Sequence, residues 1–276
     1  MFYPRILTVQ DISCVGQCSL TVALPILSAC GTECCILPSA VLSTHTGGFK
    51  GFTFNDLSND IPLIREHWEK EQLHYDALYT GYLGSAKQIQ FMSDLIDSPL
   101  LSGSKIIVDP AMGDNGKLYT GFNEEYAQLM GTLCGKADVI LPNITEACYM
   151  TGYPYREQYD ADYINGLLSA LSRICGKTII LTGVSYSSDT TGVVCADNGK
   201  TTYYEHRKVK KSFHGTGDIY SSAFTGALMT GKPVFDSARI AADYTLACIE
   251  QTVNDPSHWY GVKFELAIPN LIEMLK

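Results

Sequence analysis

The chain has 276 residues, of which 46% are hydrophobic, and its formal net charge is −9. This length and apolar content suffice for a large buried core. The acidic balance argues against nucleic acid as a partner, because a phosphate backbone calls for a positive surface. No stretch approaches the roughly 20 apolar residues that span a bilayer, and no signal-peptide pattern opens the chain. We therefore expect a cytoplasmic protein that binds neither nucleic acid nor membranes.

Ten cysteines without a C-x-x-C pair do not indicate a disulfide framework in a chain of this length. Several of them fall in apolar surroundings, where cysteine behaves as a small hydrophobic residue. We expect these to be reduced and mostly buried, and we expect no zinc site among them. They are Cys14, Cys18, Cys30, Cys34 and Cys35.

Strand-like runs alternate with helical patterns along most of the chain. In chain order, we predict a strand at residues 5–10, a helix at 16–30, a strand at 35–38, a polar loop at 43–52, a helix at 57–72, a strand at 77–82, a helix from 85 onward, a strand at 105–109, a helix at 122–136, a strand at 138–142, a helix at 159–174 and a strand at 178–182. This alternation is typical of an α/β fold with a mostly parallel sheet and helices on both faces.

The last part of the chain departs from this alternation. Residues 192–195 and 201–205 flank Asn198-Gly199, a dipeptide typical of a tight hairpin. From Asp218 onward the pattern is helical. No linker or repeat divides the sequence, so we predict one domain over residues 1–276.

Polar side chains close several of the predicted strands. In parallel sheets, ligands bind beyond the carboxyl ends of the strands, so these residues would crowd one edge. Each alone is more often a turn or cap residue than a ligand contact. Together they indicate a binding site, and they are Asp11, Thr80, Tyr82, Asp109, Asp114, Asn143, Glu146 and Thr182.

The turn Gly215-Thr216-Gly217-Asp218 leads directly into a helical pattern. Closely spaced glycines let the backbone approach a ligand, and a helix start adds free N–H groups and a positive dipole end, so the turn suits an anion. A carboxylate at a helix start is favoured in its ionised form, which makes Asp218 a candidate general base. The simpler interpretation is an ordinary turn with Asp218 as N-cap.

Common nucleotide-binding signatures do not fit. Gly176-Lys177-Thr178 and Gly199-Lys200-Thr201 lack the first glycine of a Walker A loop, and the turn at Gly215 lacks the third glycine of a dinucleotide fingerprint. One basic cluster, residues 206–211, precedes the glycine turn. It is compatible with a charged edge strand and with attraction of a polyphosphate, and the sequence leaves both interpretations open.

Five segments in a fixed order give the chain a family resemblance. They are His45-Thr46-Gly47, Thr80-Gly81-Tyr82-Leu83-Gly84-Ser85, Asp109-Pro110-Ala111-Met112-Gly113-Asp114, Pro142-Asn143-Ile144-Thr145-Glu146-Ala147 and Gly215-Thr216-Gly217-Asp218. With these segments the chain resembles, nearly end to end, the pyridoxal/pyridoxamine kinases of the ribokinase superfamily. The resemblance implies a ribokinase-like three-layer α/β/α sandwich with a mostly parallel central sheet.

The resemblance also implies phosphoryl transfer from MgATP to the 5′-hydroxymethyl group of a B6 vitamer, in salvage of pyridoxal 5′-phosphate. Asp218 would accept the hydroxyl proton, and the backbone N–H groups of Gly215, Thr216, Gly217 and Asp218 would hold the developing charge. A homodimer and a monovalent cation, K⁺ or Na⁺, belong to the same expectation. The ATP side would be formed by Asp109, Asp114, Tyr119, Asn143, Glu146, Thr182 and Val209, with Asp109 and Glu146 serving Mg²⁺ partly through water. The vitamer side would be formed by Asp11, His45, Thr46 and Tyr82.

One segment departs from the family pattern. Many members carry Gln-Ser-His after the first strand, where this chain has Gln10-Asp11-Ile12. An acidic Asp11 would favour pyridoxamine, the aminated vitamer, over the aldehyde, and we state this as a hypothesis.

Three other functions stay open at this stage. A hydroxymethylpyrimidine kinase of thiamine synthesis shares the fold, although members of that group typically carry Cys in place of Asp218. Another sugar or nucleoside kinase of the superfamily fits residues 109–119 less well. A non-catalytic module that holds a B6 vitamer would be expected to lose Asp218 or a glycine beside it.

Overall fold

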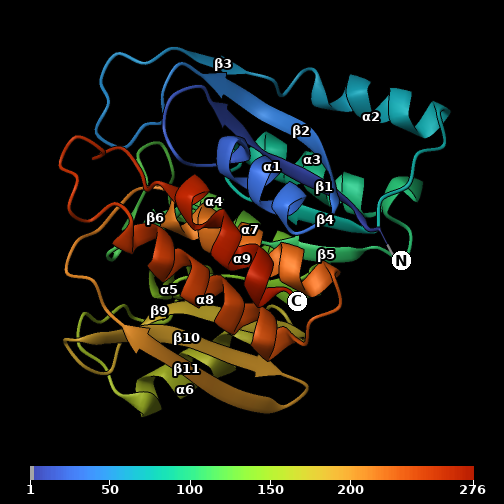
Figure 1. The fold of residues 1–276 in the computed structure, drawn as a ribbon. Helices are drawn as coiled ribbons and strands as arrows, with labels where there is room; N and C mark the ends of the chain where they lie inside the picture. Colours follow the sequence, from blue (N-terminus) through green and yellow to red (C-terminus); the bar gives the residue numbers. More distant parts are fainter. Residues whose placement is uncertain (1–2) are drawn as a thin grey trace.

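A computed structural model describes residues 3–276 (Figure 1). Within these residues the main sheet has nine strands, in the order β11-β10-β9-β8-β5-β4-β1-β2-β3. The neighbours from β9 to β2 run parallel, and antiparallel pairs close both ends of the sheet. The predicted α/β fold with a mostly parallel sheet is confirmed.

The strands of this sheet are β1 (Arg5–Ser13), β2 (Glu33–Leu42), β3 (Phe54–Asp56), β4 (Ala77–Thr80), β5 (Lys105–Val108), β8 (Val139–Ile140), β9 (Thr178–Val184), β10 (Thr190–Asp197) and β11 (Lys200–Arg207). A separate small hairpin consists of β6 (Gly113–Asp114) and β7 (Lys117–Leu118). The α-helices are α1 (Leu20–Ala29), α2 (Ile61–Lys70), α3 (Ala86–Ile96), α4 (Glu124–Cys134), α5 (Ile144–Thr151), α6 (Ala161–Leu171), α7 (Thr216–Met229), α8 (Val234–Glu250) and α9 (Ile268–Met274). Within the described residues, no helix has both the length and the hydrophobicity needed to cross a bilayer.

Apolar cores lie on both faces of the sheet. Helices α1, α7, α8 and α9 cover one face, seen in front of the strands in Figure 1, where Phe224 and Tyr244 are buried. Helices α2 to α6 cover the other face, where Met130 is buried. Neighbouring residues of β1 divide between the two cores, with Ile6 on one side and Leu7 on the other. Strands buried on both faces explain the continuous apolar runs in the sequence, and the layers are α/β/α.

Several predicted elements are present with shifted ends. The first helix begins at Leu20 rather than at residue 16, because Gly16 and Ser19 have φ angles of 123° and 53°, which a right-handed helix does not allow. The second strand is longer than residues 35–38 and runs on to Leu42, where β3 pairs with it. The sequence analysis predicted neither β3 nor α5.

The hairpin at Asn198-Gly199 is confirmed. Both residues have positive φ angles, 49° and 75°, as a two-residue turn between β10 and β11 requires. Strand β11 lies at the edge of the sheet but ends at Arg207, so the edge-strand interpretation of the basic cluster holds only for its first two residues. Ion pairs join Arg207 to Glu250 and Lys210 to Asp189.

All ten cysteines lie in the described residues and are free thiols. Cys30 is buried as predicted, but Cys14 is exposed, and Cys18, Cys34 and Cys35 are half-buried. The burial prediction is wrong for Cys14 because it lies in the loop after β1, where its neighbour Val15 is exposed as well.

Candidate active site

Gly215 caps the N-terminus of α7. Its φ of +77° is left-handed, and a Cβ there would lie 1.7 Å from the carbonyl oxygen of Gln17, so only glycine fits. The first hydrogen bond of the helix runs from the N–H of Ile219 to the carbonyl of Gly215. The N–H groups of the three residues between them are therefore available at the positive end of the helix dipole. The turn is built to hold an anion.

Asp218 is the third residue of α7 and not the N-cap of a simple turn. Its Oδ2 accepts a 3.0 Å hydrogen bond from the backbone N–H of Ser19. Burial raises the pKa of this carboxyl from 3.8 to about 7, and the charges of Asp109 and Asp11 act in the same direction. The expectation that the helix start favours the ionised form is therefore wrong, because desolvation exceeds the effect of the helix. A carboxylate that titrates near neutrality still suits a general base.

Two buried carboxylates, Asp109 and Glu146, follow β5 and β8. Asp109 Oδ2 accepts a 2.6 Å hydrogen bond from Ser221 Oγ of α7. The Glu146 carboxylate accepts hydrogen bonds from the backbone N–H groups of Met112 (3.2 Å) and Asn143 (2.8 Å). Burial raises the pKa of both carboxyls, and the charge of Asp109 raises that of Glu146 further. Each carboxylate disfavours ionisation of the other, and a cation would relieve this repulsion.

Mg²⁺ fits this pair of carboxylates. It prefers oxygen ligands and keeps several of its waters, so one or two carboxylates plus phosphate oxygens suffice. Within residues 3–276, no three His, Cys, Asp or Glu side chains gather closely enough to enclose a metal ion by themselves. Asp109 and Glu146 are therefore the residues that could hold a hydrated Mg²⁺ together with phosphate oxygens of a substrate.

Asn143 joins the end of β8 to the β6–β7 hairpin. Its side chain accepts from the N–H of Glu146 at 3.0 Å while Glu146 accepts from the N–H of Asn143, which makes a capping box at the start of α5. Asn143 Nδ2 donates to the carbonyl of Gly113 at 2.8 Å. A parallel bridge pairs Asn143 with Thr182 in β9, and Asp114 is exposed on the hairpin. The structure thus brings these predicted nucleotide-side residues together.

Asp11 and Tyr82 lie near each other at the ends of β1 and β4. Asp11 is 4% exposed, and its Oδ2 accepts a 2.8 Å hydrogen bond from Ser13 Oγ. The register between β1 and β2 shifts between Gln10 and Ile12, an irregularity that re-aims a side chain. Burial raises the pKa of Tyr82 to about 12, and the charge of Asp11 contributes, so the two groups are close in space.

His45 anchors the loop of residues 43–52 over this end of the site. Its Nε2 lies 2.7 Å from the carbonyl oxygen of Tyr260, and its Nδ1 accepts a 3.0 Å hydrogen bond from the N–H of Gly47. The centre of its ring is 5.1 Å from that of His214, the residue before the glycine turn, and 5.0 Å from that of Phe49. The loop therefore packs directly against the anion-binding turn.

Buried polar atoms lacking a hydrogen-bond partner gather at the same edge. In the described part of the chain they include Gln10 Oε1, Thr44 Oγ1 and Thr80 Oγ1, which lie near the carboxyl ends of β1, β2 and β4. A buried polar atom is costly unless water or a ligand bonds to it. These atoms mark the edge as a place for a polar ligand.

Most of the predicted side chains meet in one site. The partly exposed Tyr119 lies near them: burial raises the pKa of its hydroxyl, and the charges of Glu146, Asp114 and Asp218 raise it further. Thr46 is exposed in its loop, and Val209 lies just beyond β11. Within residues 3–276, no hydrogen bond joins these last two to the other predicted residues.

Ser19 and Ser221 were not predicted from the sequence. Ser221 lies three residues after Asp218 in α7, so helical spacing could have shown that both face the same way. Ser19 contributes its backbone N–H from a left-handed conformation, and nothing in the sequence indicates this.

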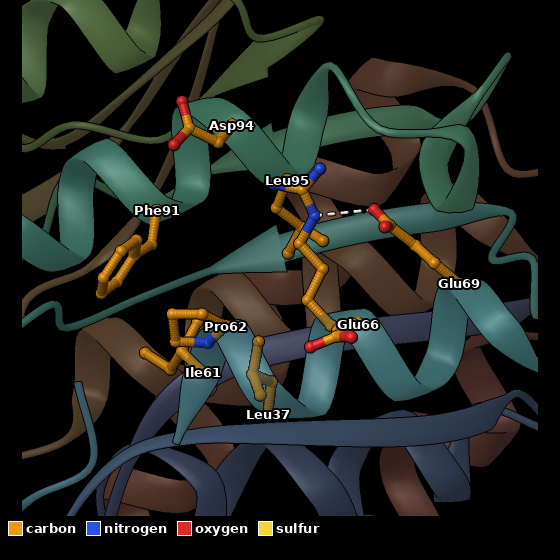
Figure 2. A pocket seen from close by; sticks show the side chains of 9 residues that line it. Leu37, Ile61, Pro62, Glu66, Glu69, Phe91, Asp94 and Leu95 are labelled. Carbon is orange, nitrogen blue, oxygen red and sulfur yellow. Dashed lines mark hydrogen bonds and ion pairs between the residues drawn. The ribbon is translucent and has the colours of Figure 1, made fainter. Parts of the chain in front are cut away.

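A pocket of about 280 Å³ lies elsewhere, between α2 and α3 (Figure 2). Leu37, Ile61 and Leu95 line it, together with the ion pair between Arg65 and Glu69. None of the predicted site residues lines this pocket. The polar edge of the sheet therefore stays the candidate active site.

A family model described as phosphomethylpyrimidine kinase matches residues 28–261. The chain belongs to this family. Among solved structures, this kinase is similar to a candidate phosphomethylpyrimidine kinase from Bacteroides thetaiotaomicron, with 37% identity and a TM-score of 0.93 over 98% of this chain and 94% of that one. Another crystal form of the Bacteroides protein, 36% identical and with a TM-score of 0.91, was solved with pyridoxal.

This kinase is also similar to a pyridoxal kinase from Lactobacillus plantarum, with 32% identity and a TM-score of 0.90 over 98% of this chain and 97% of that one. In sequence it is 28% identical over 192 residues to a hydroxymethylpyrimidine/phosphomethylpyrimidine kinase from Haemophilus influenzae, across 65% of this chain and 69% of that one. The resemblance to pyridoxal kinases is confirmed. Some relatives are named pyridoxal kinases and others hydroxymethylpyrimidine kinases. Together they establish that this chain belongs to the group of pyridoxal and hydroxymethylpyrimidine kinases.

Proposed function

We propose that this kinase transfers the γ-phosphoryl group of ATP to the 5′-hydroxymethyl group of a B6 vitamer. The observation that carries the proposal is the position of Asp218 in the first turn of α7, directly after the glycine turn and held by the N–H of Ser19. A base of pKa about 7 beside an anion-binding turn matches the needs of phosphoryl transfer to an alcohol. The relative that was solved with pyridoxal supports the substrate class.

In the proposed reaction, Asp218 takes the proton of the 5′-hydroxyl group as its oxygen attacks the γ-phosphorus. The bond from this phosphorus to the β,γ-bridging oxygen of ATP breaks, and the products are ADP and the vitamer 5′-phosphate. The free N–H groups of Thr216 and Gly217 face the charge on the transferred group. Asp218 then returns its proton to water.

The nucleotide side uses the residues around Asn143. When bound, Mg²⁺ would offset the charge of the ATP phosphates, and Asp109 and Glu146 would hold it, partly through water. Ser221 keeps the Asp109 carboxylate oriented through its 2.6 Å hydrogen bond. The resemblance adds Asp114, Tyr119, Thr182 and Val209 to this side.

The vitamer side consists of Asp11, His45, Thr46 and Tyr82. The loop of residues 43–52 covers it, and the ring of Phe49 packs 4.7 Å from that of Trp259 to fix the loop. This cover would keep bulk water away from the transferred phosphoryl group.

A hydroxymethylpyrimidine kinase is the second candidate. The description of the family and the Haemophilus influenzae relative favour it. Both substrates present a primary hydroxymethyl group on a nitrogen heterocycle, so one base could serve either. The carboxylate at Asp218, where pyrimidine kinases typically carry Cys, favours the vitamer.

ATP-dependent phosphate transfer to pyridoxal, pyridoxamine, pyridoxine and hydroxymethylpyrimidine tests the proposal, with Asp218→Ala and the exposed Asp94→Ala as matched variants. We expect turnover of at least one vitamer, lost by at least about a hundredfold in Asp218→Ala and unchanged in Asp94→Ala. Turnover of the pyrimidine alone would overturn the substrate assignment. Full activity in Asp218→Ala would overturn the assignment of the base.

A further inference from the structure

One buried carboxylate of the vitamer side has no role in the phosphoryl transfer itself. Asp11, Asp109 and Asp218 lie close enough for the charges of the first two to raise the pKa of the third. Asp218 serves as base and Asp109 serves Mg²⁺. Asp11 is just as buried, at 4% exposure against 6% for Asp109, yet it takes no part in the transfer.

Asp11 forms no ion pair in the described part of the chain. None of the ion pairs of Lys or Arg within residues 3–276 includes it. His45 is the nearby basic side chain. Both of its ring nitrogens are engaged elsewhere, since Nδ1 accepts from the N–H of Gly47 and Nε2 lies 2.7 Å from the carbonyl oxygen of Tyr260.

The groups that do contact Asp11 are hydroxyls. Ser13 Oγ donates to it at 2.8 Å, and the side chain of Ser19 also hydrogen bonds to it. Hydroxyl donors orient a carboxylate without neutralising it, and a buried unpaired charge is unfavourable. Burial accordingly raises the pKa of Asp11, and an adjacent ammonium group would lower it again.

Asp11 lies beside the group proposed as the base, because Ser19, whose side chain hydrogen bonds to Asp11, donates its backbone N–H to Asp218 at 3.0 Å. The charge of Asp11 raises the pKa of Tyr82 and of Asp218, so Asp11 lies near both a proposed ring contact and the proposed base. The B6 vitamers share the pyridine ring, its phenolic hydroxyl and the 5′-hydroxymethyl group, and they differ at one substituent. That substituent is an aminomethyl, a hydroxymethyl or an aldehyde group, and only the first carries a positive charge.

We propose that Asp11 binds a protonated primary amine of the substrate and thereby makes pyridoxamine the preferred vitamer. This inference rests on the proposed function and names its substrate more closely. Asp11 acts here as a specificity-determining residue, and the bond it forms is a charge-assisted hydrogen bond from ammonium to carboxylate.

The test compares kcat/KM for pyridoxamine and pyridoxine, a near-isosteric pair that differs by ammonium against hydroxyl. Wild type, Asp11→Asn, Asp11→Ser and Asp94→Asn are measured together. We expect wild type to prefer pyridoxamine by at least about tenfold, as one charged hydrogen bond allows. In both Asp11 variants this preference should fall by about tenfold or more, chiefly through the KM of pyridoxamine, and Asp94→Asn should keep it.

The ratio of kcat/KM for pyridoxamine to kcat/KM for pyridoxine distinguishes recognition of the amine by Asp11 from a structural effect of the substitution. Loss of Asp11 that disturbs Ser19, and through it Asp218, would lower kcat for both vitamers and leave the ratio unchanged. An unchanged ratio would overturn the inference, as would a wild type that prefers pyridoxal or pyridoxine.

Calorimetric binding of pyridoxamine and pyridoxine without ATP gives a readout independent of turnover. We expect tighter binding of pyridoxamine by wild type and equal binding of both by Asp11→Asn. If no vitamer is turned over, the proposed function fails, and a binding preference lost in Asp11→Asn would still support the role of Asp11. Equal binding of the two vitamers by wild type, or none of either, would overturn it.

Discussion

Replacing Asp218 by Asn should stabilise the protein while it removes the activity. The variant keeps the shape of the side chain and an oxygen for the N–H of Ser19, and it loses the charge. The fold raises the pKa of Asp218 from 3.8 to about 7, and roughly three pKa units at about 1.4 kcal/mol each set an upper limit of about 4 kcal/mol. Because Asp218 keeps some exposure at the mouth of the site, solvent screening lowers this gain, and we expect about 2 kcal/mol at pH 8.

The gain should depend on pH in a defined direction. The raised pKa means that between about pH 4 and pH 7 the native state binds more protons at Asp218 than the unfolded state does. The free energy of unfolding of the wild type therefore falls as pH rises through this range. Below about pH 4 the carboxyl is protonated in both states, and the two proteins should have similar stability. Above about pH 7 the full difference should appear.

Urea unfolding without nucleotide at pH 4.5 and pH 8 measures this difference, and thermal unfolding should show a rise of roughly 4–8 °C at pH 8. The same preparation should lose a factor of about 10²–10⁴ in kcat. Asp94→Asn, on the exposed side of α3, should change neither quantity. An Asn variant that is less stable than wild type at pH 8, or equally stabilised at both pH values, would refute the argument from burial.

Three further predictions concern the glycine turn, the capping box and the pH profile. Gly215→Ala should cost about 2–4 kcal/mol in urea unfolding, because of its positive φ and the backbone carbonyl 1.7 Å from the new methyl group. Gly217→Ala is its control, since apart from its chain neighbours and the backbone of its own helix nothing in the described chain lies within 4 Å of a Cβ there. Equal unfolding midpoints for the two variants would refute the steric argument. Asn143→Ala should lower the free energy of unfolding by about 1–2 kcal/mol, because the capping box is lost, and it should also raise the KM for ATP. An unchanged KM for ATP would show that Asn143 does not contribute to nucleotide binding. For the wild type, kcat/KM should fall below about pH 7 as Asp218 becomes protonated, and a profile that stays flat to pH 5 would exclude it as the base.

The fold was predictable because its signal is local. Apolar runs of four to eight residues predict buried strands, and the polar residues that follow them end up at one edge because parallel strands share a direction. Strand β3 escaped prediction because its three residues are exposed and pair only with the end of β2. Helix α5 is short and mostly buried, so it lacks a polar stripe, although the spacing of Asn143 and Glu146 indicates its capping box.

The sequence predicts which residues gather at this edge of the sheet, but it does not predict the pKa values of their side chains. The motifs identify Asp109 and Asp218 from neighbouring residues alone. The pKa of Asp218 depends on burial and on charges that the fold brings in from β1 and β5, and no local pattern carries this information. The partner of Asp109 in α7 and the isolation of Asp11 from any Lys or Arg ion pair in residues 3–276 likewise exist only in three dimensions.

The hydrogen bond between Ser19 and Asp218 joins residues that are 199 positions apart in the chain. During synthesis, the strands that carry both substrate sides are complete before α7 leaves the ribosome. Such a partial chain contains most of the binding edge but has neither the proposed base nor the anion-binding turn. If Asp218 is the base, phosphoryl transfer requires α7 to dock against the loop after β1, and turnover would then indicate that these distant segments have associated.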